Sequence, residues 1–445
     1  MNNILEKIII PNEREIRGNI TLPDEIEGAK ISWTSSHPHI ISDTDQGTLL
    51  KGVVNRQAED TEVMLSAQVS KDGVTAQKEI KVRVVKAPKE ITEADYEGYL
   101  FGHFIGEETE NHEQIYFAAS NNRLQFKDLN EKKPVLVSSI GEKGVRDPYL
   151  CRSKEGDRFF LIATDLSIYH RGGWFKNEQG YYDASTTGSP YLVLWQSNDL
   201  IHWGEPKLCN VAPENAGMAW APEMIYNDET GEYIIFFASS IMDPKTKMKA
   251  KPNAIYYVAT RDFETFSETR LFIDNQTDGS ADGKKREIID TTVIKIGDTY
   301  YSASKDGDND EECGGIRILK SKNLLDADAW EMVLNLDQLG LDTEGLQIDR
   351  LDNSTLEGPE LFQYNQKDWA DPNVPEYGIM ADQYMAGTGY LPLTTTDLED
   401  KDNSKHSWKI LKKDEYSFDT LKKRHGTILR ITKDEYEALM KAYGV

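Results

Sequence analysis

The sequence predicts an all-β protein in which a small β-sandwich precedes a five-bladed β-propeller. Over the first ninety or so residues, apolar and polar residues alternate in short segments separated by turn-forming residues. From about residue 98 onward, a group of roughly four strands recurs about every seventy residues, which is typical of a propeller. The sequence contains no run of eighteen apolar residues, so it predicts no membrane-spanning helix.

The predicted sandwich has alternating apolar residues in four segments, at 20–22, 29–33, 61–69 and 77–85. The stretch Ile31-Ser-Trp-Thr-Ser-Ser-His-Pro resembles the bacterial immunoglobulin-like modules of many polysaccharide-degrading enzymes, which implies an immunoglobulin-like β-sandwich. Pro88 interrupts the last strand and marks a linker. We therefore expect two domains, residues 1–90 and residues 91–445, with a spacer role for the first.

Four complete repeats begin near residues 145, 219, 288 and 356. Each has a strand pair rich in Tyr, Phe and Ile, followed by a second pair. A fifth repeat is assembled from strands at 114–120 and 124–126 and a late strand at 426–432. Joining both ends of the domain closes the ring and removes exposed sheet edges. A short helix is expected at 434–443, from its helix-forming composition.

The composition narrows the classes of partner. The chain has 51 Lys and Arg residues against 76 Asp and Glu residues, a formal net charge of −25. This charge repels phosphate backbones and anionic membranes, so neither nucleic acid nor a membrane is an expected partner. The apolar run at 8–10 is too short for the core of a signal peptide, so the sequence as given predicts a cytoplasmic protein.

One acidic residue stands at the head of each complete repeat: Asp147, Glu223, Asp290 and Glu357. The innermost strands of a propeller converge on a central channel, so we expect these four carboxylates at the same position of successive blades, facing one cavity. Asp-Pro and Glu-Gly-Pro are also common turn sequences, and most acidic residues only solvate a surface. Recurrence at four repeat heads favours a catalytic site.

The four acidic residues belong to four motifs: Arg146-Asp147-Pro, Trp220-Ala-Pro-Glu, Ile289-Asp290-Thr-Thr-Val and Leu356-Glu357-Gly-Pro-Glu-Leu. A fifth motif, Arg424-His425-Gly, begins the late strand. The set and order of these five motifs resemble glycoside hydrolase family 43 over residues 98–445. The resemblance implies a five-bladed propeller that hydrolyses glycosides with inversion at the anomeric carbon. It also implies that Asp147 is the general base, Asp290 the carboxylate that tunes and orients the acid, and Glu357 the general acid.

These roles predict proton affinities and a spacing. Arg146 should keep its neighbour Asp147 ionised, whereas the negative charge of Asp290 should keep Glu357 protonated near neutral pH. Inversion needs about 6.5–9.5 Å between acid and base to admit a water, whereas roughly 5 Å indicates a retaining enzyme.

Four further residues are expected to bind substrate: Arg146, Trp220, Glu223 and His425. Trp220 would stack on a sugar ring, with packing inside a blade as the alternative. Glu223 competes with Asp290 for the role of pKa modulator; we favour Asp290, with Glu223 holding sugar hydroxyls or the network beneath them.

Histidines raise the question of a metal. His425 is either a hydrogen-bonded structural residue or, as the resemblance implies, a channel histidine that holds a hydrated calcium ion. No cofactor is expected for catalysis, and any such calcium would be structural. His103 lies in an aromatic segment and is expected in the core rather than in the pocket.

The resemblance also implies the substrate class, a plant cell-wall oligo- or polysaccharide. The leading hypothesis is an exo-acting α-L-arabinofuranosidase on saccharides derived from arabinoxylan or arabinan. The alternatives on the same fold are a β-xylosidase and an endo-arabinanase. A non-catalytic carbohydrate-binding propeller is the alternative from another class, and the presence of all three catalytic motif positions argues against it.

Overall fold

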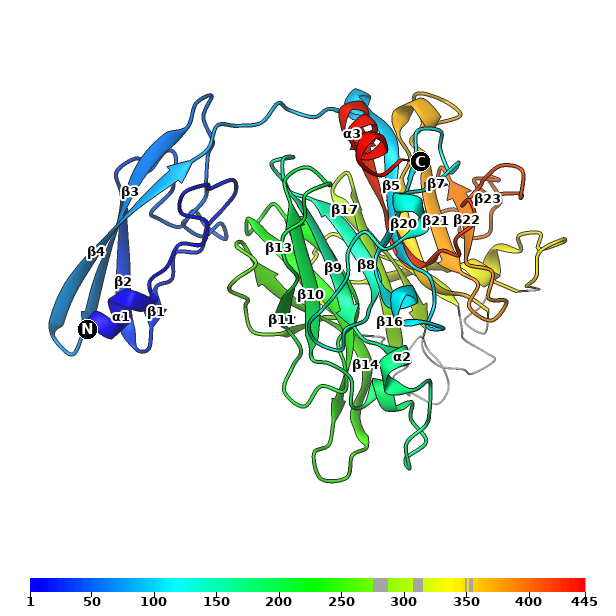
Figure 1. The fold of residues 1–445 in the computed structure, drawn as a ribbon, viewed down its shortest axis with the longest axis horizontal. Helices are drawn as coiled ribbons and strands as arrows, with labels where there is room; N and C mark the ends of the chain where they lie inside the picture. The colour runs from blue at the N-terminus through cyan, green and yellow to red at the C-terminus, as the bar shows by residue number, and fades with distance from the viewer. Residues whose placement is uncertain (275–286, 307–314, 349, 352–354, 445) are drawn as a thin grey trace.

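The computed structural model describes residues 1–274, 287–306, 315–348, 350–351 and 355–444. The described chain is mainly β, with six four-stranded antiparallel sheets. The first sheet lies beside the other five, and an extended segment after β4 leads to β5 (Figure 1). None of the described helices is long and apolar enough to cross a membrane.

The N-terminal sheet has the order β1-β2-β3-β4, with bounds Glu25–Ile26, Ala29–Ser35, Thr61–Lys71 and Val74–Val84. Alternate residues of β2 and β3 are buried, as a one-sided core requires, and Trp33 donates a hydrogen bond to the Pro23 carbonyl. The expected strand at 20–22 is not formed, and its apolar side chains instead pack into the core from irregular chain. Helix α1 (Asn2–Lys7) has no counterpart in the sequence prediction.

The other five sheets each have four strands. The first four are β8–β11 (Val145–Arg152, Phe159–Asp165, Tyr191–Ser197, Lys207–Asn210), β12–β15 (Trp220–Asn227, Glu232–Met242, Lys249–Thr260, Arg270–Ile273), β16–β19 (Ile288–Ile296, Thr299–Asp306, Ile316–Ser321, Glu331–Asn335) and β20–β23 (Glu357–Gln363, Tyr377–Asp382, Tyr390–Thr395, Trp408–Ile410). The fifth has the order β24-β5-β6-β7 (Arg424–Thr432, Tyr96–Phe104, Tyr116–Ser120, Lys127–Asp128).

The first strands of these five sheets contact one another in sequence. β8 contacts β12, β12 contacts β16, β16 contacts β20, β20 contacts β24, and β24 contacts β8. The last strand of the chain pairs with β5, so one sheet is assembled from both ends of this region, as the sequence predicted. The expected strand at 124–126 is not formed, and the sheet instead contains β5 and β7. Helix α3 (Lys433–Tyr443) follows β24 and begins at a capping box formed by Thr432 and Glu435.

One more short helix and six 3-10 turns complete the described helical elements. Helix α2 (Ile168–Arg171) follows β9. The 3-10 turns are η1 (Glu93–Asp95), η2 (Glu110–Glu113), η3 (Asn130–Lys132), η4 (Asp183–Ser185), η5 (Leu336–Leu339) and η6 (Gln366–Asp368). They lie in connections, so strands supply the framework.

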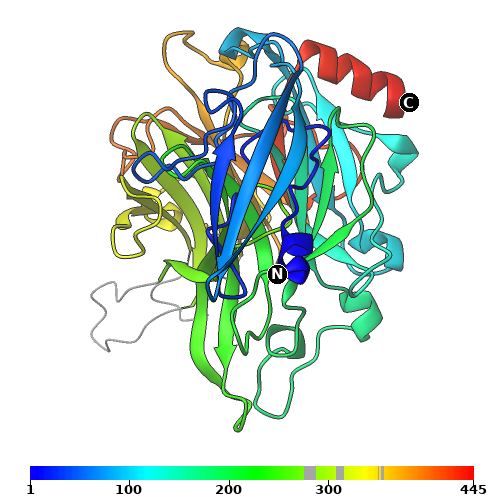
Figure 2. The ribbon, with the colours of Figure 1, turned by 90° about the vertical axis from the view of Figure 1, so that its left-hand side faces the viewer.

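The N-terminal sheet is held against the larger region by buried charged groups, and Figure 2 shows it in front of the other sheets. The Asp157 carboxylate accepts hydrogen bonds from Arg17 at 2.6 Å and from Arg56 at 2.8 and 2.9 Å. Arg261, which is 5% exposed, donates to the carbonyls of Leu50 and Lys51. The hydrogen bonds of Asp157 and Arg261 therefore satisfy polar groups of both the N-terminal region and the larger region.

Candidate active site

A β-bulge recurs near the start of all five first strands. The register shifts between Arg146 and Tyr149, Trp220 and Glu223, Ile289 and Thr291, Glu357 and Glu360, and Arg424 and Thr427. In four of the strands the second residue of the bulge has a positive φ: Asp147 at 49°, Ala221 at 48°, Asp290 at 51° and Gly358 at 52°. Bulges redirect side chains and are common beside active sites.

The pairing makes the residues of the five bulges equivalent. Position 1 holds Arg146, Trp220, Ile289, Glu357 and Arg424; position 2 holds Asp147, Ala221, Asp290, Gly358 and His425; position 4 holds Tyr149, Glu223, Thr292, Glu360 and Thr427. The interactions below join residues of the same position across neighbouring or opposite sheets.

The equivalence corrects one prediction. The four carboxylates do not share one position, because Asp147 and Asp290 occupy position 2, Glu357 position 1 and Glu223 position 4. Apolar patterning locates the start of each strand, but the bulge decides which residue of the motif turns in a given direction.

Position 2 brings together Asp147, Asp290 and His425. His425 Nδ1 lies 3.4 Å from Asp147 Oδ1, and the Thr164 hydroxyl donates to Asp147 Oδ2 at 2.8 Å. Asp290 Oδ2 accepts a hydrogen bond of 3.1 Å from the Gly358 amide. All three side chains are largely removed from solvent, so their charges interact strongly.

Gly358 makes this arrangement possible. A Cβ atom on Gly358 would lie 2.6 Å from Cγ of His425, and the residue also has a positive φ. Glycine is therefore required twice, for the backbone conformation and for the close approach of the imidazole.

His425 is the central cation of the site. Burial alone lowers the pKa of His425, but the hydrogen bond with Asp147 and the negative charges of Asp290, Asp147 and Glu357 raise it to about 9. The imidazole is therefore charged at neutral pH. Burial raises the pKa of Asp147, yet the His425 interaction, the Arg146 charge and the Thr164 hydrogen bond lower it overall, which agrees with an ionised Asp147.

Glu357 is bound by two cations. Lys305 donates to Glu357 Oε2 at 3.0 Å and Arg424 donates to Oε1 at 2.9 Å, while Arg424 also pairs with buried Asp382. Burial raises the pKa of Glu357, but the charges of Lys305 and Arg424 outweigh it and lower the pKa overall. Lys305 and Arg424 therefore favour the charged form of Glu357, whereas the sequence analysis expects a protonated side chain near neutral pH.

The pKa of Asp290 is shifted in the opposite direction from that of Glu357. Burial raises the pKa of Asp290, and the charges of Glu357 and Asp147 add to this effect, although His425 and Lys305 oppose it. The surroundings of Asp290 thus favour its protonated form, whereas those of Glu357 favour its charged form.

A second carboxyl pair lies at position 4. Glu360 accepts hydrogen bonds from the Thr427 hydroxyl at 2.9 Å and the Ile428 amide at 3.0 Å, and burial raises its pKa to about 7. Burial and the charge of Glu360 raise the pKa of Glu223 well above its ordinary value. Glu223 is 5% exposed and interacts with Glu360, so the two carboxyl groups form a buried pair.

Arg146 and Trp220 occupy position 1 with Glu357. The Arg146 guanidinium donates to buried Glu113 at 3.1 Å, lies 3.6 Å from Glu107 and faces the Trp174 ring at 5.6 Å from its centroid. Trp220 is partly buried and meets Trp174 edge-on, with ring centroids 6.3 Å apart. Arg146 is thus a buried cation paired with Glu113, and Trp220 packs against Trp174 beside it; substrate binding by these two residues stays a prediction.

The predicted calcium ion at His425 would need side chains nearby that can bind a metal. Among the described residues there is no group of three or more His, Cys, Asp or Glu side chains arranged to hold a metal ion. Because Nδ1 of His425 faces Asp147, Nε2 would be the single nitrogen that this side chain offers, and it could bind a cation only after the imidazolium has lost its proton. A cation bound there would need water for its other ligands. His103 is fully buried, with Nδ1 3.1 Å from the Phe104 carbonyl, and belongs to the core as predicted.

Comparison with known proteins identifies the family. Residues 94–437 match the profile of a family 43-related group described as "Probable glycosyl hydrolase domain", which covers more than half of the chain. The chain belongs to this glycosyl hydrolase family. Residues 9–87 match the atrophied bacterial Ig domain, which confirms the immunoglobulin-like resemblance of the N-terminal region.

The hydrolase also resembles individual proteins. An α-L-arabinofuranosidase of Bifidobacterium longum subsp. longum is 27% identical over 421 residues, which cover 86% of this chain and 36% of that protein. The chain thus spans little more than a third of the curated relative's length. Among solved structures, an endo-1,4-β-xylanase from Bacteroides thetaiotaomicron (12% identity, TM-score 0.44, 74% of this chain and 92% of that one) and an α-L-arabinanase from Cellvibrio cellulosa complexed with arabinohexaose (11%, 0.42, 72% and 93%) are similar. Both scores are low, so membership rests on the family profile.

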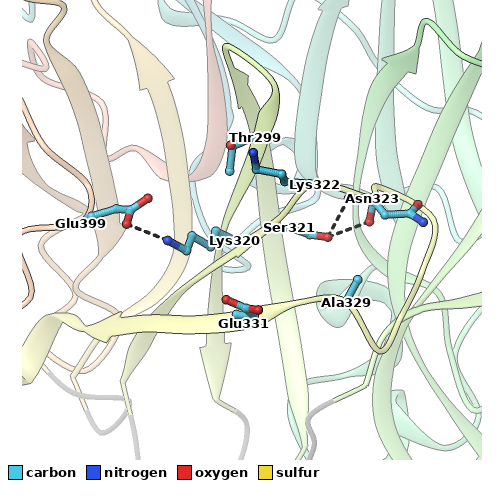
Figure 3. A pocket seen from close by; sticks show the side chains of 8 residues that line it. All are labelled: Thr299, Lys320, Ser321, Lys322, Asn323, Ala329, Glu331 and Glu399. Atoms are coloured by element: carbon cyan, nitrogen blue, oxygen red, sulfur yellow. Dashed lines mark hydrogen bonds and ion pairs between the residues drawn. The ribbon is translucent and has the colours of Figure 1, made fainter.

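A different cavity of the hydrolase lies at the other end of β17 and β18 from Lys305. It is lined by Thr299, Lys320, Ser321, Lys322, Asn323, Ala329, Glu331 and Glu399 (Figure 3). Lys320 donates to Glu399 at 2.7 Å, and Lys322 pairs with Asp298 at 3.1 Å. These lysines already have acidic partners, and the cavity holds none of the predicted site residues.

The sequence did not indicate several residues of the site. Lys305 is the penultimate residue of β17, and Glu360 follows Glu357 in the same motif, but neither was singled out. Glu107 lies 3.5 Å from Arg424 and accepts a hydrogen bond from Trp174. The one available signal was a second acid in Leu356-Glu357-Gly-Pro-Glu-Leu, since position 4 of another motif is also Glu.

Proposed function

We propose that the protein is an inverting glycoside hydrolase in which Asp147 is the general base, Glu357 the general acid and Asp290 the residue that tunes and orients the acid. The observation that carries this proposal is the contrast at positions 1 and 2. Asp147 is held ionised by His425, whereas Glu357 is paired with two cations, Lys305 and Arg424. Two carboxyl groups with different surroundings are what acid–base cleavage of a glycoside requires.

Glu357 must gain a proton before it acts as an acid. In the unliganded protein, Lys305 and Arg424 favour its charged form. A sugar that accepts hydrogen bonds from these two cations and excludes water would remove that stabilisation, while the nearby negative charge of Asp290 would remain. The pKa of Glu357 would then rise in the complex, and its proton would pass to the leaving oxygen.

Asp147 supplies the other half of the reaction. An ionised carboxylate accepts a proton from water as the water attacks the anomeric carbon. His425 and Thr164 hold Asp147 in place and leave it in the charged form. We expect the Asp147 and Glu357 carboxyl groups to lie about 6.5–9.5 Å apart when substrate is bound, because the water needs that space.

We also infer that the five sheets are blades of a closed β-propeller, and that residues 1–90 and 91–445 are separate domains. The circular sequence of contacts from β8 to β24 and back to β8 supports closure. The pairing of β24 with β5 supports a fifth blade built from both ends of the region. The bulges near the start of the first strands would then surround one channel.

The proposed substrate is a saccharide derived from arabinan or arabinoxylan, and the proposed reaction is exo-acting α-L-arabinofuranosidase cleavage. The relative from Bifidobacterium longum supports this choice. A β-xylosidase and an endo-arabinanase remain the alternatives on this fold. No cofactor is proposed for the chemistry, and a calcium ion at His425 would be structural.

The test is a panel of aryl glycosides together with arabinan and arabinoxylan, scored by the sugar released. We expect the fastest turnover on the aryl α-L-arabinofuranoside and release of single arabinose units from the polymers. Faster turnover of the aryl β-xyloside, or release of oligosaccharides from arabinan, would replace the proposed activity with the corresponding alternative. Binding of saccharides without any turnover would contradict the enzymatic proposal.

A further inference from the structure

The exposed aromatic residues of the described chain are concentrated in one loop. Tyr169, Trp174, Phe175 and Tyr182 are the exposed Phe, Tyr and Trp side chains among the described residues, with exposed fractions of 47%, 43%, 48% and 49%. All four lie in the loop at 166–190, between β9 and β10. Clustered exposed apolar groups mark binding sites more often than isolated ones do.

The fold holds this aromatic loop in a defined conformation. Lys176 and Tyr182 form an isolated β-bridge that closes a short hairpin. Arg171 donates to Glu142 Oε2 at 2.8 Å and to Asp183 Oδ2 at 3.1 Å, which anchors both ends of the hairpin to the body of the protein. The rings are therefore presented by a cross-linked structure and not by an unsupported segment.

The aromatic loop is continuous with the carboxylate site. The Trp174 ring packs edge-on against Tyr182, with centroids 5.6 Å apart, and against Trp220 at 6.3 Å. Trp174 Nε1 donates to Glu107 at 3.0 Å, and Glu107 lies 3.5 Å from Arg424, which binds Glu357. Two residues, Glu107 and Arg424, thus lie between Trp174 and a proposed catalytic carboxyl.

The same loop also presents polar groups. Together with residues of the connection at 215–216 and the β13–β14 hairpin, it lines a cavity of about 440 Å³. The loop residues in this cavity are Asn177, Gln179, Asp183, Thr186 and Thr187. Sugar rings offer C–H faces to aromatic rings and hydroxyls to amide and hydroxyl groups, so the combination fits a neutral saccharide.

We propose that the aromatic loop is a second saccharide-binding subsite, which holds the sugar units of an oligosaccharide beyond the unit at the carboxylates. This inference rests on the proposed function, since it assigns the loop to the same substrate. The aromatic loop would then select longer chains over small glycosides, because a short aryl glycoside occupies the carboxylate site alone.

The test uses the full-length chain with Phe175→Ala and Tyr182→Ala, and Met332→Ala as the control. Met332 is an equally exposed apolar side chain on outer strand β19. Hydrolysis of an aryl α-L-arabinofuranoside is compared with binding of arabinohexaose and of an arabinoxylan oligosaccharide, measured by calorimetry in a Glu357→Gln background. We expect each loop variant to weaken binding of at least one oligosaccharide about 5–10-fold, the effect of losing one stacking ring, with aryl glycoside turnover unchanged within about twofold.

Unchanged affinity for both oligosaccharides in both variants would overturn the subsite, as would equal losses with the aryl glycoside. Failure of both oligosaccharides to bind would overturn it as well. If the wild-type chain hydrolyses no glycoside, the proposed function fails, while the calorimetric comparison still decides the subsite. Met332→Ala should match the wild type in every assay.

Discussion

Glu357 lies between Lys305 and Arg424, and these cations set its proton affinity in the unliganded protein. A general acid works only while protonated, so the rate falls as pH rises through its pKa. Lys305 lowers the pKa of Glu357, and removal of that positive charge should raise it. We expect Lys305→Met to shift the alkaline limb of the kcat/KM profile upward by roughly one pH unit.

Lys320→Met is the matched control, because Lys320 pairs with Glu399 in the cavity away from the site. Its profile should equal that of the wild type. An alkaline limb that stays in place, or moves to lower pH, in Lys305→Met would show that Lys305 does not tune the acid.

The roles of Glu357 and Asp147 differ in their dependence on the leaving group. Glu357→Gln removes the proton donor, so we expect a loss of about 10²–10⁴-fold on an alkyl or sugar leaving group and a much smaller loss on a dinitrophenyl glycoside. Asp147→Asn should impair both substrates, because water still needs a base. Steady-state rates on the two substrates test whether Glu357 is the acid. An equal loss of rate on both substrates in Glu357→Gln would contradict this role.

The motifs predicted Asp147, Asp290 and Glu357 as neighbours of one site, and the structure places all three in first strands at bulges. Their charge states were not predictable. The proton affinity of Glu357 depends on Lys305, which reaches it from the neighbouring sheet, and no spacing along the chain reveals that contact.

At the scale of the element, the bulges in the first strands position the site. The apolar pattern of a strand locates a motif along the chain to within a residue or two. A shift of one residue in the strand pairing, however, moves a side chain to the other face of the sheet. This explains why the sequence predicted the strand pairs of β8–β24 well but aligned Glu223 with Asp147. The pairing of Glu223 with Glu360 at position 4 followed only from the register.

Gly358 is constrained both by its backbone conformation and by the nearby His425 ring. Gly358→Ala would place a Cβ atom 2.6 Å from the His425 ring in a backbone conformation that disfavours side chains. Gly387, with φ of +65° and open space around its Cβ position, is the control for backbone strain alone. We expect Gly387→Ala to lower the free energy of unfolding by about 1 kcal/mol and Gly358→Ala by about 1–3 kcal/mol more.

Chemical denaturation measures both variants, and activity separates them further. Displacement of His425 should reduce the activity of Gly358→Ala, whereas Gly387→Ala should stay near wild type. Equal unfolding free energies for the two variants would show that the imidazole does not need the space above Gly358.

At the scale of the whole molecule, buried ionic contacts join the N-terminal sheet to the larger region. Burial raises the pKa of Asp157, but hydrogen bonds and charges of Arg56 and Arg17 lower it overall. A lowered carboxyl pKa contributes stability above its unfolded value, and that contribution is lost as pH falls through the folded pKa. The ion pairs of Asp157 with Arg17 and Arg56 should therefore form at neutral pH and weaken in acid.

Asp157→Ala leaves Arg17 and Arg56 without their shared carboxylate. We expect cleavage by protease in the segment at 85–92 to become several-fold faster, because the buried Arg56 guanidinium loses the Asp157 carboxylate, whereas Arg17 keeps Glu15. Asp228→Ala is the control, since it removes an exposed pair with Lys154 inside the larger region. Equal cleavage rates in the two variants would mean that Asp157 does not hold the N-terminal sheet in place.

The sequence predicted the two-part organisation and the assembly of one sheet from both ends of the larger region. It did not predict helix α1 or the contact of Asp157 with two arginines, since both depend on surfaces that meet only after folding. The N-terminal region is thus joined to the larger region through Asp157, and its role as a spacer stays a prediction.

The stereochemistry of hydrolysis tests the central claim most directly. Proton NMR of the reaction, recorded within the first minutes on the best aryl glycoside of the panel, identifies the anomer that forms before mutarotation. The proposed action of Asp147 on water and Glu357 on the leaving oxygen predicts a first product of inverted configuration, β-arabinofuranose from an α-L-arabinofuranoside. A first product of retained configuration would contradict it.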